Sequence, residues 1–446
     1  MDMKGFSCWH TLHSFSELSI RSELCYDPQV ELSCFQKVFS DQDLLTLILL
    51  RVVPVRKLVC FSSVSKLWHY IITAPRFSLL RSNCSLPLRT SALFFQINVC
   101  KTGVPNFISF VPLDNDIHTT STSPFREFPF SYARDPRSLR VRIVHSCAGL
   151  LLCSSCPYSV LEHRFRYYVY NPTTNRLRTL PMHDHFYRPF AAVLAFDPSK
   201  SPHYRVFICS KPKTPEFTFP VITQFYIYSS ETGTWSLSGQ PFTSPPADNS
   251  YFNSVYCNGC IHWIRESVSV SKTPDRDVGK SIQYFNLDEE KLEAMPAPPL
   301  GLRSSRPVTF YMGVSQNHLH VVEVYACENI LNVYEMENDY SGWFLKYEVD
   351  LSPISQVFPE MMMTPDQVYI LSLVRRENFQ EDSFLVLHIP GKPRKAIHYN
   401  LVDRCFKGIW DFTYPEYLNK LRSWFYMPEL CVGFFEDQGL SSLDKW

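Results

Sequence analysis

The chain has 446 residues, of which 45% are hydrophobic and 15% are aromatic. This composition excludes an intrinsically disordered protein, because disordered chains are poor in aromatic and β-branched residues. The 43 Lys and Arg residues balance 43 Asp and Glu residues, so no overall positive charge would attract nucleic acid. The longest strongly apolar run, Leu44 to Leu50, is much shorter than the roughly 20 residues that cross a bilayer. We therefore expect a folded protein that binds neither nucleic acid nor a membrane.

Residues 1–38 contain scattered aromatic residues without a period or a repeat, which is typical of a poorly ordered leader. They also lack the basic start and apolar run of a secretory signal. Without such a signal, the 15 cysteines favour free thiols in a reducing compartment. We expect the protein to work inside the cell, in the nucleus, the cytoplasm or both.

Residues 39–80 are predicted to hold three short helices. Apolar residues recur at helical spacing from Leu44 to Val52. Asp41 and Asp43 precede them, at the end where the helix dipole favours negative charge. Pro54 ends this helix and can begin the next one, because a proline at the first helical position loses no hydrogen bond.

A second short helix comes after Pro54, and Ser65 is well placed to cap a third. In the third helix Trp68 shares one face with Ile71 and Ile72, and Pro75 is expected to end it. After Phe77 the pattern changes to short β-branched and aromatic runs, broken by Pro, Asn, Asp and Gly. The rest of the chain is therefore predicted to be β structure.

The β region repeats. A strand end with an aromatic residue before a polar turn recurs at steps of 58, 57, 49 and 54 residues, at Tyr170, Tyr228, Phe285, Tyr334 and, more weakly, at His388. Another strand candidate precedes each of them, at residues 149–153, 204–209, 260–264, 318–324 and 367–373. Two or more strands per unit at a period near 50 are typical of propeller blades. A hairpin candidate at 92–99 and 107–111 could add another blade, so we expect five to seven.

The helical segment resembles the F-box. The resemblance rests on an ordered set of residues: Asp43-Leu44-Leu45, Ile48-Leu49-Leu50-Arg51, Pro54-Val55, Val64-Ser65-Lys66-Leu67-Trp68 and Ile71-Ile72. In that family the module docks on a Skp-type adaptor, which links it to a cullin and a RING subunit. A module this small gains stability by completing its core against a partner. The resemblance implies adaptor contacts through Leu44, Leu45, Ile48, Leu49, Pro54, Val64 and Trp68.

Two departures from the F-box pattern affect this expectation. Phe39-Ser40-Asp41 stands where the family commonly has Leu-Pro, and the interval from Asp43 to Pro54 is one residue longer than usual. One extra residue rotates the next part of a helix by about 100°, unless the turn before Pro54 absorbs it. Adaptor affinity therefore depends on where the first helix ends.

The β region is similar to the F-box-associated region of large plant F-box families. The similar segments lie at residues 149–153, 170–181, 196–198, 228–235, 258–263 and 334–343. We accordingly expect an α+β protein in which a small three-helix F-box precedes a large all-β, propeller-like domain. The expected parts are a leader at 1–38, the F-box at 39–80, the kelch-like β domain at 90–410 and a C-terminal extension at 411–446.

Metal and catalytic chemistry have little support. Cys257 and Cys260 form a CxxC, and Cys147, Cys153 and Cys156 cluster, but three of these cysteines fall in apolar strand candidates, so buried free thiols are the better interpretation. Two alternating His pairs, 183 with 185 and 318 with 320, lack a third ligand. Glycine-rich phosphate loops and the motifs of hydrolases are absent. The three tryptophans of the repeats, Trp235, Trp263 and Trp343, are expected in the core between blades.

The resemblance implies the substrate-recognition subunit of an SCF-type E3 ubiquitin ligase, with no catalytic residue, cofactor or metal of its own. The F-box would bind the Skp-type adaptor, and the β domain would bind a target protein for ubiquitination. Two alternatives stay open. One is a propeller-type protein- or sugar-binding module that works without a ligase, and the other is a propeller enzyme with acidic or His residues converging at one end of its channel.

Overall fold

The computed structural model describes residues 37–52, 55–83, 90–97, 107–112, 140–156, 166–172, 174, 176–182, 187–211, 221–244, 254–266, 280–296, 298–299, 309–358, 368–375, 383–389, 395–411 and 430–436. The expected leader lies outside them, apart from its last two residues. The chain falls into two compact units, Met1–Leu49 and Leu50–Trp446. The helices come first along the chain: α3 (Gln42–Leu50), α4 (Val55–Phe61), α5 (Lys66–Thr73) and α6 (Pro75–Asn83).

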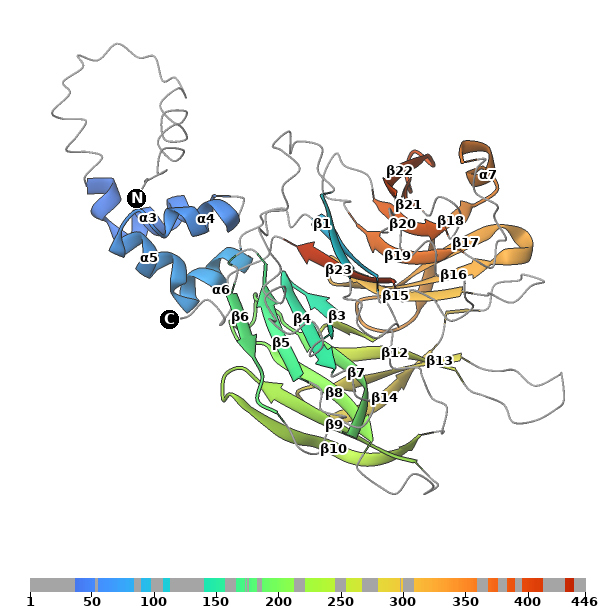
Figure 1. The fold of residues 1–446 in the computed structure, drawn as a ribbon, viewed down its shortest axis with the longest axis horizontal. Helices are drawn as coiled ribbons and strands as arrows, with labels where there is room; N and C mark the ends of the chain where they lie inside the picture. The colour runs from blue at the N-terminus through green and yellow to red at the C-terminus, as the bar shows by residue number, and fades with distance from the viewer. Residues whose placement is uncertain are drawn as a thin grey trace, which may run out of the picture. The chain divides into compact units, whose positions relative to one another are not determined.

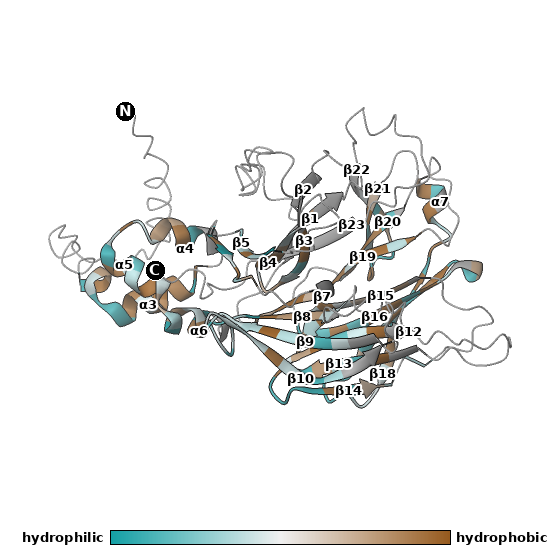
Figure 2. Ribbon diagram, turned by 60° about the horizontal axis from the view of Figure 1, so that its bottom comes forward, coloured by the Kyte–Doolittle hydropathy of each residue, from teal (hydrophilic) through white to brown (hydrophobic). Residues whose placement is uncertain are grey.

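The starts of α3 and α5 are explained by the sequence. The Asp41 carboxylate accepts hydrogen bonds from the backbone N–H groups of Asp43 and Leu44, at 2.9 and 3.0 Å. The Ser65 hydroxyl accepts one from the N–H of Trp68 at 3.2 Å. Both side chains satisfy amide groups that have no partner within the helix. Hydrophobic and hydrophilic residues lie side by side along these helices (Figure 2).

Helix α6 was not expected from the sequence. Pro75 was expected only to end α5, but it begins α6, because the first position of a helix needs no N–H donor. Phe77 and Arg81 of α6 are buried, and Arg81 Nη1 donates a hydrogen bond to the Val52 carbonyl at 2.7 Å. A contact between residues this far apart in the chain leaves no periodic trace in the sequence.

The described strands form five four-stranded antiparallel sheets and one three-stranded sheet. We number the four-stranded sheets as blades in chain order. The first blade is β3 (Arg140–Cys147), β4 (Leu150–Cys156), β5 (Arg166–Asn171) and β6 (Arg176–Thr179), and the second is β7 (Tyr187–Ala195), β8 (Arg205–Lys211), β9 (Val221–Ser229) and β10 (Thr234–Ser244). The third is β11 (Val255–Cys257), β12 (Cys260–Glu266), β13 (Lys280–Asn286) and β14 (Lys291–Met295).

The fourth blade is β15 (Thr309–Ser315), β16 (His318–Tyr325), β17 (Ile330–Met336) and β18 (Trp343–Asp350), with the short 3-10 helix η2 (Ala326–Glu328) between β16 and β17. Helix α7 (Ile354–Val357) leads to the fifth blade, β19 (Tyr369–Val374), β20 (Phe384–Ile389), β21 (Lys395–Asn400) and β22 (Phe406–Asp411). The three-stranded sheet consists of β1 (Thr90–Ile97), β2 (Phe107–Pro112) and β23 (Leu430–Glu436).

The sheets form a β-propeller, as the sequence predicted. The first strands β3, β7, β11, β15 and β19 contact one another in this order, and β23 contacts both β19 and β3. The ring is closed by strands from distant parts of the chain, because β23 pairs with β1 and β1 with β2 (Figure 1). Residues 411–446 were expected as an extension outside the β domain, whereas β23 lies within that range.

The sequence repeat maps onto the blades with one exception. In the first four blades the aromatic strand end falls in the third strand and the preceding candidate in the second. In the fifth blade the weak repeat at His388 falls in β20, the second strand. The third strand is β21, which ends in Tyr399-Asn400 as β5 ends in Tyr170-Asn171.

Burial explains why the middle strands are such continuous apolar runs. Almost every residue of β16 and β5 is buried, whereas the outer strands β6 and β14 are mostly exposed. A middle strand is covered on both faces by the neighbouring blades, so an alternation of polar and apolar residues would place polar groups inside.

Two tryptophans join neighbouring blades at their outer strands. Trp235 Nε1, in β10, donates to the Pro181 carbonyl just after β6, and Trp343 Nε1, in β18, donates to the Pro296 carbonyl just after β14; both distances are 2.8 Å. We call each of these contacts a Trp–Pro clasp. Trp263, in contrast, is fully buried, as expected for a core residue.

Candidate functional site

Helix α3 has two apolar faces with different surroundings. Leu45 and Leu49 are completely buried, whereas Leu44, Leu47 and Ile48 are 46%, 59% and 44% exposed. The exposed residues have i, i+3 and i+4 spacing, so they form one stripe along the helix. Three large aliphatic side chains side by side in water make this stripe a candidate binding surface.

Helices α4 and α5 pack through a small aromatic core. The rings of Phe61 and Trp68 meet edge to face with centroids 5.5 Å apart, and Trp68, Ile71 and Ile72 are buried. Val64, in the turn between the helices, is 52% exposed, and Tyr70 of α5 is 63% exposed. These two side chains are also available to a partner.

The seven residues predicted to contact an adaptor differ in their exposure to solvent. Leu44, Ile48 and Val64 are exposed, whereas Leu45, Leu49 and Trp68 are buried, and Pro54 lies outside the described residues. The sequence analysis missed Leu47 and Tyr70. Leu47 could have been found from its spacing to Leu44, but nothing in the sequence distinguishes Tyr70 from a core residue.

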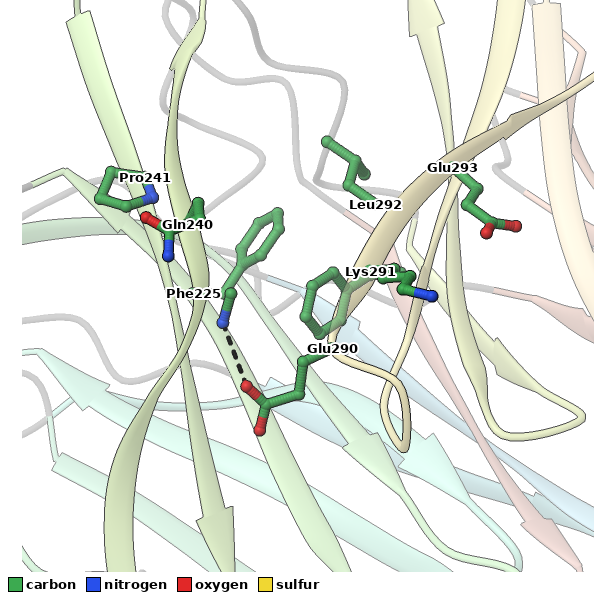
Figure 3. Close-up of a pocket in the computed structure, with 9 residues that line it drawn as sticks. Phe225, Gln240, Pro241, Glu290, Lys291, Leu292 and Glu293 are labelled. Atoms are coloured by element: carbon green, nitrogen blue, oxygen red, sulfur yellow. Dashed lines mark hydrogen bonds between the residues drawn. The ribbon is translucent and has the colours of Figure 1, made fainter.

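A groove of about 390 Å³ lies between the second and third blades, at their outer strands (Figure 3). One wall is the stretch Gly239-Gln240-Pro241, where the pairing of β10 with β9 skips residues and the strand bulges. The other wall is Glu290–Glu293, at the start of β14, and the buried rings of Phe225 and Phe285 form the floor. At the bulge the two walls touch, because Gly239 lies against the Phe285 ring and donates a hydrogen bond to Glu290.

Of two carboxylates near this groove that have neutral hydrogen-bond donors, Glu290 lies on the groove side of the third blade, whereas Glu293 faces the opposite side with Tyr284. Glu290 accepts a hydrogen bond from the Gly239 N–H at 3.2 Å, and Glu293 accepts one from the Tyr284 hydroxyl. The other acids of the β13–β14 turn are compensated, Asp288 by Arg205 at 2.8 Å and Glu289 by Lys291 at 3.3 Å. The Glu290 carboxylate therefore lies at the groove, where its hydrogen bond to Gly239 joins the two walls.

A buried ionic cluster lies between the fourth and fifth blades. The Glu335 carboxylate at the end of β17 is contacted by four groups: Lys346 Nζ at 2.7 Å, His320 Nε2 at 3.0 Å, and His318 Nδ1 and Arg375 Nη1 at 3.1 Å. Burial alone would raise the pKa of Glu335, but the hydrogen bonds from His320 and Lys346 outweigh it and lower that pKa to about 2. The cluster thus holds an ionised carboxylate at neutral pH.

The histidines and cysteines considered for metal binding have other roles. His318 and His320 both contact Glu335, and His183 and His185 lie outside the described residues. Burial, with the nearby Cys260, raises the pKa of the Cys257 thiol to about 12, so it is a neutral donor, and its Sγ lies 3.4 Å from the Asn317 carbonyl oxygen. In the part of the chain that the structure describes, no group of three His, Cys, Asp or Glu residues could hold a metal ion, and no helix is long and apolar enough to cross a membrane.

Comparison with known proteins identifies the family. Residues 108–337 match the family model of the F-box associated beta propeller domain. F-box protein At5g07610 of Arabidopsis thaliana is 32% identical over 389 residues, which cover 84% of this chain and 86% of the relative. The chain belongs to the F-box protein family. The resemblance seen in the sequence is thereby confirmed, and F-box membership supports a non-catalytic, substrate-receptor role in general.

Solved structures resemble this F-box protein only distantly. A chain of a nidogen–laminin complex matches with a TM-score of 0.38 at 12% identity, covering 78% of this chain and 99% of its own. An α-L-arabinofuranosidase of Fusarium graminearum matches with a TM-score of 0.36 at 13% identity, covering 63% and 83%. Likeness at this level says nothing about activity.

Proposed function

We propose that this F-box protein is the substrate-recognition subunit of an SCF-type ubiquitin ligase. Its helices bind a Skp-type adaptor, which links them to the cullin and RING subunits, and its propeller binds a target protein. The protein contributes no catalytic residue. It acts by holding the target near the ubiquitin-charged enzyme, so that proximity supplies the acceleration.

The observation that carries this proposal is the exposed stripe of Leu44, Leu47 and Ile48 on α3. Burying such a stripe on a partner removes apolar surface from water, which is the main favourable contribution to protein association. Val64 is a further exposed candidate from the F-box pattern. In this proposal Leu45, Leu49 and Trp68 act indirectly, because they are buried and hold the helices in shape.

The extra residue before Pro54 is compatible with this arrangement. Helix α3 is continuous to Leu50, and the next described residues, Arg51 and Val52, are not helical. The phase of the Leu44, Leu47 and Ile48 stripe is therefore set before the insertion. Adaptor binding through α3 does not require the insertion to be absorbed within the helix.

The test is co-purification of the full chain with a Skp-type adaptor. Replacing Leu44 and Ile48 together by Asp should weaken adaptor retention by at least about tenfold, because two charges would enter a desolvated interface. Leu237→Asp is the matched control, since Leu237 is an exposed leucine on the propeller, 55% accessible. It should retain the adaptor fully.

A chain lacking residues 39–77 completes this experiment and should not retain the adaptor. If the double variant and this deletion both co-purify with the adaptor as the intact chain does, the ligase role is excluded. A propeller-type protein- or sugar-binding module that works without a ligase would then be the better account.

We further propose that the protein works in the nucleus, the cytoplasm or both. Free cysteines support a reducing compartment such as these. Cys257 and Cys260 face each other across a two-residue turn, and both are free thiols. Imaging of a fluorescently tagged full chain checks this, and accumulation in the secretory pathway would contradict it.

A further inference from the structure

We propose that the junction of the first and second blades binds an acidic side chain of the target protein, Asp or Glu, through Arg178 and the hydroxyl groups of Tyr204 and Tyr228. This inference rests on the proposed function, because it names a group that the target would place on the propeller. Within the described part of the chain, three observations carry it: a half-buried arginine without a carboxylate partner, two buried hydroxyl groups without an acceptor, and a backbone frame that fixes those hydroxyl groups.

Arg178 points from the outer strand of the first blade towards the second blade. It pairs with Val169 in β5, and residues directly opposite each other in a sheet share a face. Val169 packs in one apolar cluster with Tyr204 and Tyr228 of the second blade. The Nη2 atom of Arg178 lies 3.7 Å from the point where a β-carbon at residue 233 would be, in the turn between β9 and β10. The guanidinium therefore lies in the junction, beside this turn.

The charge of Arg178 distinguishes it from two other partly buried arginines of the propeller. Arg205 contacts Asp288 at 2.8 Å, and Arg375 contacts Glu335 at 3.1 Å. Arg178 is half-buried as well, but it forms no ion pair with any residue that the structure describes. A partly desolvated guanidinium is stabilised by a carboxylate, which can bind it through two parallel hydrogen bonds. The junction therefore favours an acidic ligand.

Two hydroxyl groups beside Arg178 also need an acceptor. Tyr204 and Tyr228 are fully buried, with ring centroids 6.3 Å apart, and neither hydroxyl has a hydrogen-bond partner at normal distance among the described residues. Arg178 lies close to both, but a guanidinium can only donate. Burial raises the pKa of both hydroxyl groups, so they are neutral donors at physiological pH. A carboxylate oxygen is the acceptor that these donors lack.

The backbone around the two hydroxyl groups is held by hydrogen bonds. The Tyr204 N–H donates to the Ser230 Oγ at 2.8 Å, and the Ser230 N–H donates to the Tyr204 carbonyl at 3.0 Å. The Trp–Pro clasp of Trp235 links the two blades at the same junction. Arg178, in contrast, belongs to the mostly exposed strand β6, so its side chain can turn towards solvent without moving the blade. A carboxylate bound to its guanidinium then reaches the hydroxyl groups.

The experiment begins with selection from a random heptapeptide phage library on the immobilised full chain. We expect the selected peptides to be enriched in Asp and Glu. The strongest peptide is then synthesised with a fluorescent label, and its affinity is measured by anisotropy at low and high salt. Affinity should fall at high salt, because Arg178 is only half-buried and Arg176, on the same face of β6, is exposed.

Substitutions of arginine test the assignment to this junction. Arg178→Gln removes the charge and should weaken peptide binding about tenfold. Arg178→Lys should recover part of the affinity, because it keeps the charge but cannot form two parallel hydrogen bonds. Arg166→Gln is the matched control, since Arg166 is an exposed arginine of β5 whose strand position faces away from the second blade. It should bind the peptide like the unaltered chain.

Tyr228→Phe separates binding from a merely structural role. It removes a buried hydroxyl that has no acceptor among the described residues, so the variant should unfold at the same urea concentration as the unaltered chain or at a higher one. Its affinity for the peptide should nevertheless fall about two- to fivefold, because one donor to the carboxylate is lost. A structural hydroxyl would give the opposite pattern, with lower stability and unchanged affinity, and this result would overturn the proposal.

The proposal is also overturned if the selected peptides lack acidic residues, or if Arg178→Gln and Arg166→Gln bind the peptide equally. A further arm replaces the acids of the peptide by phosphoserine. Binding of the phosphorylated peptide alone would overturn the assignment to a carboxylate. Adaptor retention is measured on every variant in parallel, and loss of adaptor binding with intact peptide selection would refute the ligase role and leave the acidic-ligand site standing.

Discussion

The junctions between successive four-stranded blades are of two kinds. The first and second blades, and the third and fourth, are joined at their outer strands by the Trp–Pro clasps of Trp235 and Trp343. At the other two junctions, the outer strand of the later blade has Leu292 or Phe406 at the position of Trp235, opposite Phe285 and Tyr399. These junctions instead carry the groove and the Glu335 cluster. Departures from the repeat thus mark the places where the propeller is chemically distinctive.

The two junctions without a clasp in the described part of the propeller also differ from each other. The junction of the second and third blades is held by an aromatic cluster, with Phe207, Phe225 and Phe285 in mutual contact. The junction of the fourth and fifth blades relies on Glu335, which Arg375 reaches from just beyond β19. Packing of aromatic rings tolerates changes in pH, whereas a buried carboxylate depends on each of its partners.

The largest effect in this comparison is expected from Glu335→Gln. The side chain of Glu335 is only 4% exposed, and the substitution removes the buried charge that Lys346 and Arg375 both contact. The free energy of unfolding should fall by about 3–5 kcal/mol. Urea unfolding followed by tryptophan fluorescence measures this change.

Glu337→Gln is the matched control for that substitution. Glu337 lies two residues further along the chain and is exposed, so its replacement should change the free energy of unfolding by less than about 0.5 kcal/mol. Equal effects of the two substitutions would mean that the ionic cluster does not hold the fourth and fifth blades together.

The sequence predicted the propeller because its signal is local and repeated. Apolar runs at a period near 50 identify the middle strands, since each of these is covered on both faces by its neighbours. In the fifth blade Tyr399-Asn400 is the true third-strand end, but the stronger apolar run before His388 drew the assignment one strand too early. Strand β23 was assigned to an extension, because its pairing with β1 joins the two ends of the domain and leaves no periodic signal.

The candidate sites were predictable only in part. Helical spacing and the F-box resemblance identified α3, but the sequence could not separate exposed Leu44 from buried Leu45, because both are leucines in one apolar run. The groove was not predicted at all. It arises from a bulge at Gly239 that contacts Glu290 on another blade, and no pattern within either strand connects these residues. His318 and His320 were recognised as a pair, but their carboxylate partner became visible only in three dimensions.

A smaller effect on stability is expected from the protonation of His262, which lies at the junction of the third and fourth blades. His262 of the third blade is buried and stacks on Tyr284 and on Tyr340 of the fourth, with both pairs of ring centroids 5.6 Å apart. Burial lowers the pKa of His262 from 6.5 to about 4. The unfolded chain therefore binds a proton more readily than the folded one, so stability falls as the pH drops from 6.5 towards 4 and is constant above that window.

The variant His262→Phe isolates this contribution, because it keeps an aromatic ring between the tyrosines and removes the titrating group. Between pH 7 and pH 5 the unaltered chain should lose on the order of 1–2 kcal/mol more of its unfolding free energy than the variant does. Urea unfolding at the two pH values measures the difference. Parallel losses in both proteins would show that His262 is not protonated on unfolding.

The smallest effect concerns the clasp itself. Trp343→Phe retains a ring at the junction but removes the N–H that donates to the Pro296 carbonyl, which should lower the free energy of unfolding by about 1 kcal/mol. Trp235→Phe should give a similar value, since its hydrogen bond to Pro181 has the same length. Phe344→Leu, at an exposed position of the same strand, should change stability by less than about 0.5 kcal/mol. If both tryptophan variants match this control, the clasps do not hold their junctions closed.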